Sequence, residues 1–285
     1  MSLLDGRTAL VTGAARGQGR AHAVALARQG ASVVLVDIGH DLATIPYPLG
    51  SGTELSHAAG AVEAVGGRAL AIEADVRVQE QLDAAVAAGI ERFGGIDICV
   101  ANAGVLSNAS FWEVTEEQWS ELLDVNLGGV WRTAKAVAPH MIERRSGSIV
   151  IIGSVNAVEA SPGLVHYTAA KHGALGVMRT VALELAPYGV RCNAVCPGAT
   201  DTGMINWQGM YDRFAGHEGG GHADLERGAK YYHVLAPNDV LQPEEISGAV
   251  LFLASDMSAK VTGACIPVDA GHLVLPGVNT TATAP

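Results

Sequence analysis

The sequence predicts an α/β fold in which a single domain is built on a doubly wound, seven-stranded parallel sheet flanked by helices. Short apolar runs rich in β-branched residues alternate with longer Ala-rich segments of helical period, which is typical of βαβ units. The runs 33–36 and 149–152 are continuously apolar, as strands buried on both faces should be. With 285 residues, 49% of them hydrophobic, the chain can bury one large core, and no internal repeat or linker divides it.

The expected elements alternate in order along the chain. Strands are predicted at 8–11, 32–37, 69–73, 96–101, 148–152, 190–195 and 264–268, and helices at 18–29, 56–65, 79–92, 116–142, 167–186 and 243–254. Abundant glycine (35 residues) and few aromatic residues (5%) suit repeated tight strand-to-helix turns packed with small aliphatic side chains. The domain is expected to span 1–279, and the tail 280–285 is expected to be disordered.

One segment that departs from this alternation, 39–53, follows the second strand and is called the insertion here. It contains Pro46, Pro48, Gly50 and Gly52, which is too much turn chemistry for a helix or a strand. In a sheet of this kind the chain passes over the ligand crevice at this point, so we expect the insertion to cover a cofactor.

A second such segment, 200–238, is called the lid here and separates the sixth strand from the last helix. We expect it to be a structureless excursion that covers the substrate, because long insertions in compact domains are usually lids or binding loops. It is rich in aromatic residues and contains three consecutive glycines: Trp207, Tyr211, Phe214, Tyr231 and Tyr232, with 219–221.

A glycine-rich turn follows the first strand. Gly13, Gly17 and Gly19 open the next helix and would let backbone amides approach a pyrophosphate, although glycines alone are also found in ordinary strand-to-helix turns. Asp37 ends the second strand, where its carboxylate can accept hydrogen bonds from the adenosine ribose and would repel a 2′-phosphate. Arg16 indicates the opposite, since a base could pair with that phosphate. Asp37 lies where the 2′ group should be, so the sequence favours NAD over NADP.

Tyr167 and Lys171 are four residues apart and would project from one face of a helix. An ordinary tyrosine has a pKa of about 10, but a neighbouring ammonium and a positive nicotinamide ring would lower it. Tyr167 could then take the hydroxyl proton of an alcohol while hydride leaves for the nicotinamide. Ser154, at the end of the fifth strand, could hold the substrate oxygen where charge develops. The pair alone would more often be an ordinary helix surface pair.

Together these motifs resemble the classical short-chain dehydrogenases/reductases, whose glycine motif has the TGxxxGxG spacing found at 12–19. The resemblance extends roughly over residues 4–271 and implies a Rossmann fold. It also implies a fourth catalytic residue, Asn126, whose side chain and a water extend a proton relay to the lysine. Members of this family are usually tetramers, so a homotetramer is expected.

Further positions match the cofactor site of that family one by one. Residues 75–76 resemble its adenine pocket, and 102–104 resemble its Asn-Ala-Gly motif, although Ala101 replaces a commoner Asn. Residues 197–198 with Thr202 resemble the segment that holds the nicotinamide carboxamide. The residues expected to bind NAD are therefore Gly13, Arg16, Gly17, Gln18, Gly19, Asp37, Ile38, Asp75, Val76, Asn102, Ala103, Gly104, Tyr167, Lys171, Pro197, Gly198 and Thr202.

The insertion, with Pro-Tyr-Pro at 46–48, resembles the mycofactocin-associated branch of the family, which includes carveol dehydrogenase-like proteins, and 261–263 and 267–272 fit that branch too. The resemblance implies that the insertion covers NAD, which then does not exchange and is reoxidised in place by a mycofactocin-type redox carrier. Gly39 stands where relatives tend to carry a larger residue. An ordinary enzyme with exchangeable NAD is the alternative.

The lid is apolar and adaptable near its start, which suits a hydrophobic secondary alcohol or its ketone. The resemblance implies a terpenoid such as carveol. The alternative is that these side chains pack a subunit interface. They are Met204, Ile205, Trp207, Met210, Tyr211 and Phe214.

Composition excludes several other functions. The chain has 18 basic and 29 acidic residues, a net charge of −11, which gives no electrostatic case for binding nucleic acid or an anionic membrane. The first strand leaves no room for a signal peptide, and no apolar run is long enough for a membrane helix, so a reducing cytoplasm is expected.

No metal site is expected either. The spacing of His217, His222 and His233 matches no zinc motif, while His166 and His172 are expected to pack or to face solvent. The cysteines form no CxxC pair and read as small buried hydrophobes: Cys99, Cys192, Cys196 and Cys265. A rival function is that of a catalytically silent dinucleotide sensor, against which the intact Asn-Ser-Tyr-Lys set argues.

Overall fold

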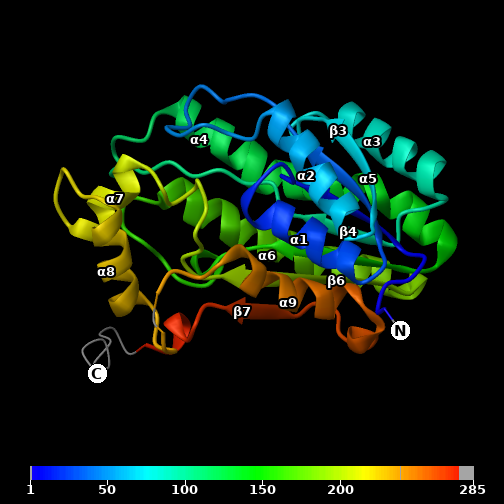
Figure 1. The fold of residues 1–285 in the computed structure, drawn as a ribbon. Helices are drawn as coiled ribbons and strands as arrows, with labels where there is room; N and C mark the ends of the chain where they lie inside the picture. The colour runs from blue at the N-terminus through cyan, green and yellow to red at the C-terminus, as the bar shows by residue number, and fades with distance from the viewer. Residues whose placement is uncertain (1, 238, 276–285) are drawn as a thin grey trace.

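The computed structural model describes residues 2–237 and 239–275, so the tail predicted at 280–285 lies outside the described residues. Seven parallel strands form one sheet in the order β3-β2-β1-β4-β5-β6-β7, which confirms the predicted fold class (Figure 1). The strands are β1 (Thr8–Thr12), β2 (Ser32–Asp37), β3 (Arg68–Glu73), β4 (Ile98–Ala101), β5 (Gly147–Ile152), β6 (Val190–Pro197) and β7 (Cys265–Val268).

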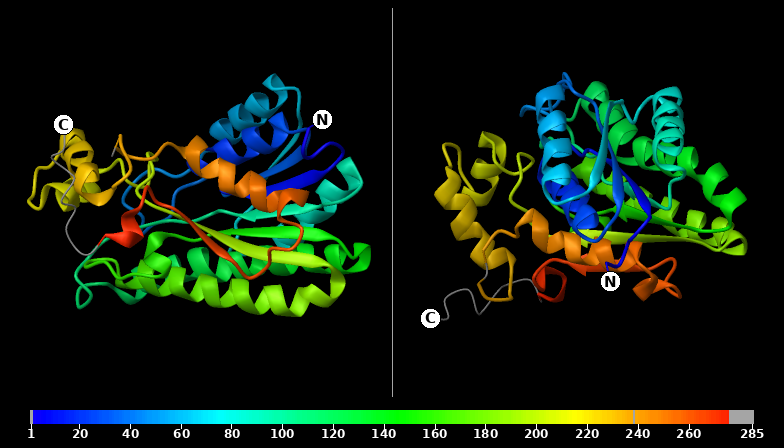
Figure 2. Two further views of the ribbon diagram at one scale, coloured as in Figure 1. Left: turned by 90° about the horizontal axis from the view of Figure 1, so that it is seen from below. Right: turned by 45° about the vertical axis from the view of Figure 1, so that its right-hand side comes forward.

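Helices cover both faces of this sheet (Figure 2). Side chains of α1, α2 and α9 build one core against it, and side chains of α3, α5 and α6 build the other. The helices are α1 (Gly17–Arg28), α2 (Gly52–Ala64), α3 (Gln79–Phe93), α4 (Glu116–Leu123), α5 (Gly129–Arg144), α6 (Val165–Leu185), α7 (Gln208–Ala215), α8 (His222–Tyr232) and α9 (Pro243–Ala254). Short helical turns are η1 (Asp124–Gly128), η2 (Val155–Ala157), η3 (Ala186–Tyr188), η4 (Asp256–Ser258) and η5 (His272–Val274).

The strand order reverses between β1 and β4. β1 pairs in parallel with β2 on one side and with β4 on the other, so the chain leaves the ends of β1 and β4 in opposite directions. Such a switch point leaves a crevice at the carboxyl ends of the strands, where ligands bind in open α/β sheets.

The single helix predicted at 116–142 is wrong in one respect, because the structure divides it. α4 passes into the π-helical turn η1, which contains Asn126, and the chain then continues as α5. A π-turn adds one residue to a helical turn without changing the local composition, so hydrophobic periodicity does not reveal it.

The insertion ends earlier than the sequence suggested. Ser51 and Glu54 form a capping box, in which Glu54 N–H donates to Ser51 Oγ (3.2 Å) and Ser51 N–H donates to the Glu54 carboxylate (2.9 Å). Since this box satisfies the first free amides of a helix, α2 begins at Gly52 rather than at residue 56.

The lid is not structureless, as the sequence suggested, but contains α7 and α8, which stand together beyond one end of the sheet (Figures 1 and 2). Phe214 of α7 packs against Tyr232 of α8, with ring centres 6.3 Å apart. Gly216, in the left-handed conformation (φ +76°), ends α7, and Gly221 N–H donates to Asp224 at the start of α8 (2.8 Å). Of the three glycines that signalled a loop, Gly221 is thus the N-cap of α8, while Gly216 caps the end of α7.

Candidate functional site

The glycine-rich turn lies tightly against the end of β4. A Cβ atom at Gly13 would stand 2.8 Å from Ala103 Cα, and one at Gly19 would stand 2.0 Å from the carbonyl oxygen of Gly13. The turn therefore packs only because these residues lack side chains. It directs the first amides of α1 toward the crevice, where the helix N-terminus favours negative charge.

Asp37 ends β2 beside this turn and is 8% exposed. Its carboxylate accepts hydrogen bonds from the backbone N–H of Ala15 (2.9 Å) and of Ile38 (2.8 Å). Burial raises the pKa of Asp37, and these hydrogen bonds and the nearby Arg16 act in the opposite direction. Each carboxylate oxygen can accept a further bond, so two ribose hydroxyls have acceptors here.

One cavity of about 1040 Å³, open to solvent, runs from this carboxylate to the start of α6. The side-chain oxygen Oε1 of Gln18, which lines it, is buried without a protein partner and leaves an acceptor for a ligand. Fifteen of the residues predicted to bind a cofactor line the cavity: Gly13, Arg16, Gly17, Gln18, Gly19, Asp37, Ile38, Asp75, Val76, Asn102, Ala103, Gly104, Tyr167, Lys171 and Thr202. A dinucleotide fits this arrangement of phosphate-binding turn and ribose acceptor.

A second hollow adjoins the first and shares Gln18, Tyr167 and Thr202 with it. Ser154 lines this second hollow, as do the two remaining predicted cofactor residues, Pro197 and Gly198. Tyr167 therefore borders both spaces and stands where two ligands would meet.

Tyr167 and Lys171 lie in the first turns of α6 and are both buried. The Tyr167 hydroxyl is hydrogen-bonded to Ser154, while Lys171 Nζ donates to the Ile152 carbonyl (2.9 Å) and lies 5.6 Å from the Tyr167 ring centre. Burial raises the pKa of Tyr167 to about 12 and lowers that of Lys171 to about 8. The expected lowering of the Tyr167 pKa by Lys171 is not seen within the protein itself: desolvation raises this pKa, and the bond to Ser154 acts in the opposite direction.

Asn126 lies deeper, in the π-turn η1, and lines neither hollow. Its side-chain oxygen accepts from Val105 N–H and its amide donates to the Val105 carbonyl, both at 2.8 Å. These bonds engage both polar groups of the side chain. The amide keeps one further N–H donor and the oxygen one further lone pair, so the relay role suggested for this side chain stays a prediction. The π-turn interrupts the helical hydrogen-bond ladder at this point.

The insertion contributes residues that were not among the predicted cofactor contacts. Leu42, Tyr47, Leu49 and Gly50 line the larger cavity together with the glycine turn. Tyr47 is buried, its hydroxyl oxygen accepts a hydrogen bond from Leu106 N–H (2.9 Å), and its ring centre lies 5.8 Å from that of Trp207 in the lid. The insertion is therefore packed onto the body of the protein.

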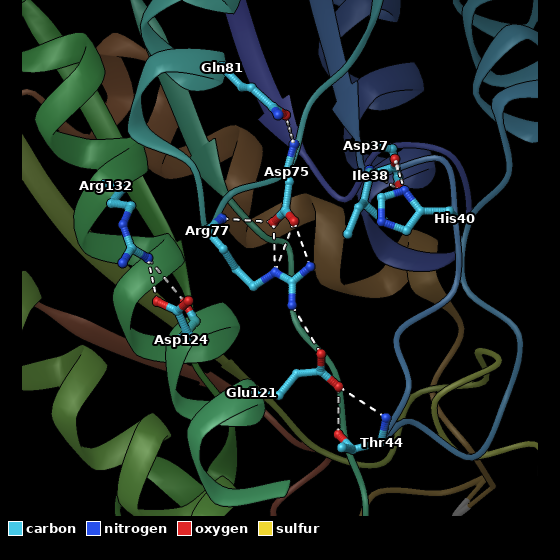
Figure 3. A network of polar contacts seen from close by, with 10 residues as sticks. All are labelled: Asp37, Ile38, His40, Thr44, Asp75, Arg77, Gln81, Glu121, Asp124 and Arg132. Atoms are coloured by element: carbon cyan, nitrogen blue, oxygen red, sulfur yellow. Dashed lines mark hydrogen bonds and ion pairs between the residues drawn. The ribbon is translucent and has the colours of Figure 1, made fainter. Parts of the chain in front are cut away.

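A chain of polar contacts joins the insertion to the predicted adenine pocket (Figure 3). Asp75 pairs with Arg77 (2.7 Å), and Arg77 pairs with Glu121 of α4 (3.0 Å). Glu121 in turn accepts hydrogen bonds from both the backbone N–H (3.0 Å) and the hydroxyl (2.7 Å) of Thr44 in the insertion. The carboxylate of Asp75 raises the pKa of Arg77, which keeps the network charged.

Arg16 also contacts the insertion. Its guanidinium donates to the Pro48 carbonyl of the insertion and lies against Gly203 of the lid. The pairing of Arg16 with a 2′-phosphate, which the sequence left open, would compete with this contact.

The remaining polar residues play structural parts. His166 is buried and shares a 2.8 Å hydrogen bond with Ser107. Cys196 and Cys265 lie with their sulfur atoms 2.9 Å apart, and both are free thiols. Within residues 2–237 and 239–275, no group of three or more His, Cys, Asp or Glu side chains could hold a metal ion. No helix in that same part of the chain has the length and apolar character to cross a membrane.

Comparison with known proteins gives consistent matches over nearly the whole chain. A family model described as enoyl-(acyl carrier protein) reductase matches residues 13–272. The (−)-trans-carveol dehydrogenase of Rhodococcus erythropolis is 43% identical over 95% of this chain and 99% of its own length. An uncharacterised NAD-dependent oxidoreductase of Mycobacterium tuberculosis is 44% identical, covering 95% and 97%. The crystal structure of carveol dehydrogenase from Mycobacterium avium in complex with NAD superposes with a TM-score of 0.93 at 40% identity, covering 96% and 100%.

Proposed function

The chain belongs to the short-chain dehydrogenase/reductase family and is an NAD-dependent oxidoreductase, and we propose that it acts on a hydrophobic secondary alcohol or the corresponding ketone. The observation that carries this proposal is the position of Tyr167 between the two hollows, with Ser154 and Lys171 beside it. A carveol-like terpenoid suits the apolar side of the second hollow, which is formed by Leu164, Met204, Ile205, Met210 and Phe214.

Each side chain has a defined part in this reaction. NAD held in the larger cavity supplies the hydride acceptor, and its oxidised ring adds a positive charge that favours the Tyr167 phenolate. Tyr167 takes the hydroxyl proton of the alcohol, and Ser154 holds the same oxygen by a hydrogen bond. Lys171, held by the Ile152 carbonyl, keeps its ammonium next to the tyrosine ring. The alcohol loses a hydride and a proton and becomes the ketone.

Replacing Tyr167 by Phe tests this assignment. The variant keeps the ring but loses the proton-transferring oxygen, so turnover of carveol or another accepted secondary alcohol should fall by about 100-fold or more. Binding of NAD should be nearly unchanged. Tyr188→Phe, which removes a hydroxyl from a more exposed residue in η3, is the matched control. Wild type that binds NAD but turns over no alcohol or ketone would favour the rival sensor function.

We propose further that the insertion retains NAD, so that the cofactor is reoxidised in place by a mycofactocin-type redox carrier. The support is the set of contacts that Thr44, Tyr47 and Pro48 make with α4, with Leu106 and with Arg16. Prolines lower the entropy that the insertion must lose to close, which favours a cover that stays shut. The alternative is an enzyme with freely exchanging NAD.

The protein as purified distinguishes these two enzymes. We expect denatured protein to release NAD or NADH, and the native enzyme to turn over repeatedly with an artificial electron acceptor while added NAD stimulates it little. Cofactor-free protein that saturates normally with added NAD would exclude retention.

We propose a cytoplasmic homotetramer as the working form. Trp131 of α5 (47% exposed) and Leu183 of α6 (76% exposed) present apolar surface on helices that a partner subunit could cover. Analytical ultracentrifugation should give four times the chain mass, and a monomer would contradict the proposal.

A further inference from the structure

The second hollow is apolar on one side and carries a single charged side chain. Leu164, Met204, Ile205 and Phe214 form apolar walls next to Tyr167. Of the described residues that line this hollow, Arg213 of α7 is the only one that is charged at neutral pH.

Arg213 has no anionic partner in the part of the chain that the structure describes. Within the described residues no carboxylate lies within ion-pair distance of it, whereas Arg7, Arg77, Arg132 and Arg144 each pair with an Asp. The polar contact that it makes is to the Pro162 carbonyl, which uses one of five N–H donors.

Two acids in this part of the chain and fold are already engaged. Asp212, the neighbour of Arg213 in α7, accepts from Gln208 (2.7 Å) and from Gly220 N–H (2.8 Å). Glu159, on the segment before α6, pairs with His272 (2.8 Å). Burial lowers the pKa of Arg213 because the guanidinium is partly desolvated. A desolvated guanidinium without an anion is unfavourable, so an anionic ligand would gain more here than in water.

Neutral donors accompany the charge. Ser161 lines the same hollow, and its oxygen accepts from the Asn156 amide (2.8 Å). Its own hydroxyl proton has no acceptor among the described residues, so it can be donated to a ligand. Tyr232 lines this hollow as well.

We infer that the substrate is a hydrophobic hydroxy acid or keto acid, whose carboxylate is bound by Arg213 while its carbinol carbon lies at Tyr167. This inference rests on the proposed function and narrows its substrate class, from hydrophobic secondary alcohols in general to acids, in place of a neutral terpenoid such as carveol. A single planar guanidinium with one hydroxyl donor matches a carboxylate, since phosphate sites usually gather more donors or a helix N-terminus. The apolar walls between the two ends would hold the carbon skeleton.

A matched substrate pair tests the inference: 4-hydroxycyclohexanecarboxylate and its methyl ester, with the NAD-loaded enzyme and an artificial electron acceptor. Wild type should favour the acid over the ester by about 10- to 100-fold in kcat/KM, the range for a hydrogen bond to a charged group. Arg213→Gln should remove that preference mainly through KM. Arg213→Lys should keep part of the preference.

The control is Arg227→Gln, which removes the same charge from the lid at an exposed residue paired with Asp224. It should leave both substrates unaffected. If wild type turns over carveol or the ester as well as the acid, and Arg213→Gln changes neither, the inference is overturned while the proposed function stands. If wild type that holds NAD oxidises none of the three alcohols, the proposed function fails.

A binding measurement keeps the test independent of turnover. Cyclohexanecarboxylate should bind the NAD-loaded protein about 10- to 100-fold more tightly than cyclohexanecarboxamide, and Arg213→Gln should abolish the difference. Equal binding of the acid and the amide to wild type would overturn the inference.

Discussion

Glu121 offers the sharpest test of whether the insertion holds the cofactor. Its carboxylate is the acceptor for two hydrogen bonds from Thr44, at 3.0 and 2.7 Å, and it also pairs with Arg77. Glu121→Ala removes all of these contacts without touching the walls of either hollow. The insertion would then be held by Tyr47 and Pro48 alone among the contacts described above.

The size of the effect follows from these contacts. Hydrogen bonds to a charged group contribute about 1.5–3 kcal/mol each. The Glu121 side chain is 15% exposed, and Thr44 can bond to water when the cover opens, so we expect a net loss near one such bond rather than two. If opening of the insertion limits release, NAD should dissociate about 10- to 100-fold faster, since 1.4 kcal/mol corresponds to a factor of ten.

The assay is the rate at which NADH fluorescence is lost when reduced, cofactor-loaded protein is diluted into an excess of an NADH-consuming enzyme. Glu117→Ala is the matched control, because it removes the same charge from an exposed position of the same helix α4. Circular dichroism verifies that both variants are folded. Equal release rates for wild type and Glu121→Ala would refute the argument that this network closes the cover.

Three further predictions follow from the same geometry. Asp37→Ala should weaken the binding of NAD by about 10- to 100-fold and reduce the discrimination against NADP, as measured by titration with both cofactors. A wild-type protein that already prefers NADP would contradict the cofactor assignment. Cutting the insertion to a short connection between β2 and α2 should make steady turnover depend on added NAD. Unchanged retention of NAD by this variant would count against the proposed role of the insertion. Burial lowers the pKa of His22 from 6.5 to about 3, so the unfolded chain takes up a proton below pH 6.5 that the folded chain does not. The free energy of unfolding should therefore fall by about 2 kcal/mol from this group between pH 7 and 5. His22→Gln, which can still bond to Ser247, should lose that part of the pH dependence in urea titrations, and an unchanged slope would refute it.

The sheet could be predicted from the sequence because strand and turn signals are local. The apolar runs before Asp37, Asn102 and Gly153 are strands in the structure, and these three residues lie at the carboxyl edge of the sheet. Two elements could not be predicted in this way. Asn126 in the π-turn bonds to Val105 in a different segment, which leaves no local signal. The lid helices are short and bounded by glycines that equally signal loops.

The candidate site likewise has a part that could be predicted from local sequence motifs and a part that could not. The glycine turn, Asp37 and the Tyr167–Lys171 pair belong to short motifs whose spacing determines their relative positions. The bond between Thr44 and Glu121 joins residues 77 positions apart, and that between Tyr47 and Leu106 joins residues 59 apart. Neither leaves a periodic pattern, so only the folded structure reveals that the insertion is held down. The position of Arg213 beside apolar side chains in the second hollow could not be predicted either, because these residues come from distant segments of the chain.

The insertion and the lid meet at two points, and these contacts limit how each segment can move. Arg16 bonds to Pro48 of the insertion and lies against Gly203 of the lid, while the rings of Tyr47 and Trp207 are 5.8 Å apart. If substrate enters past the lid, contacts on this side are disturbed in every turnover. Glu121, which bonds to Thr44, belongs to α4. This helix is not part of the lid, and none of its residues lines either hollow. A cover held from that side can stay closed while α7 and α8 move, which is the arrangement that retention of NAD through many turnovers requires.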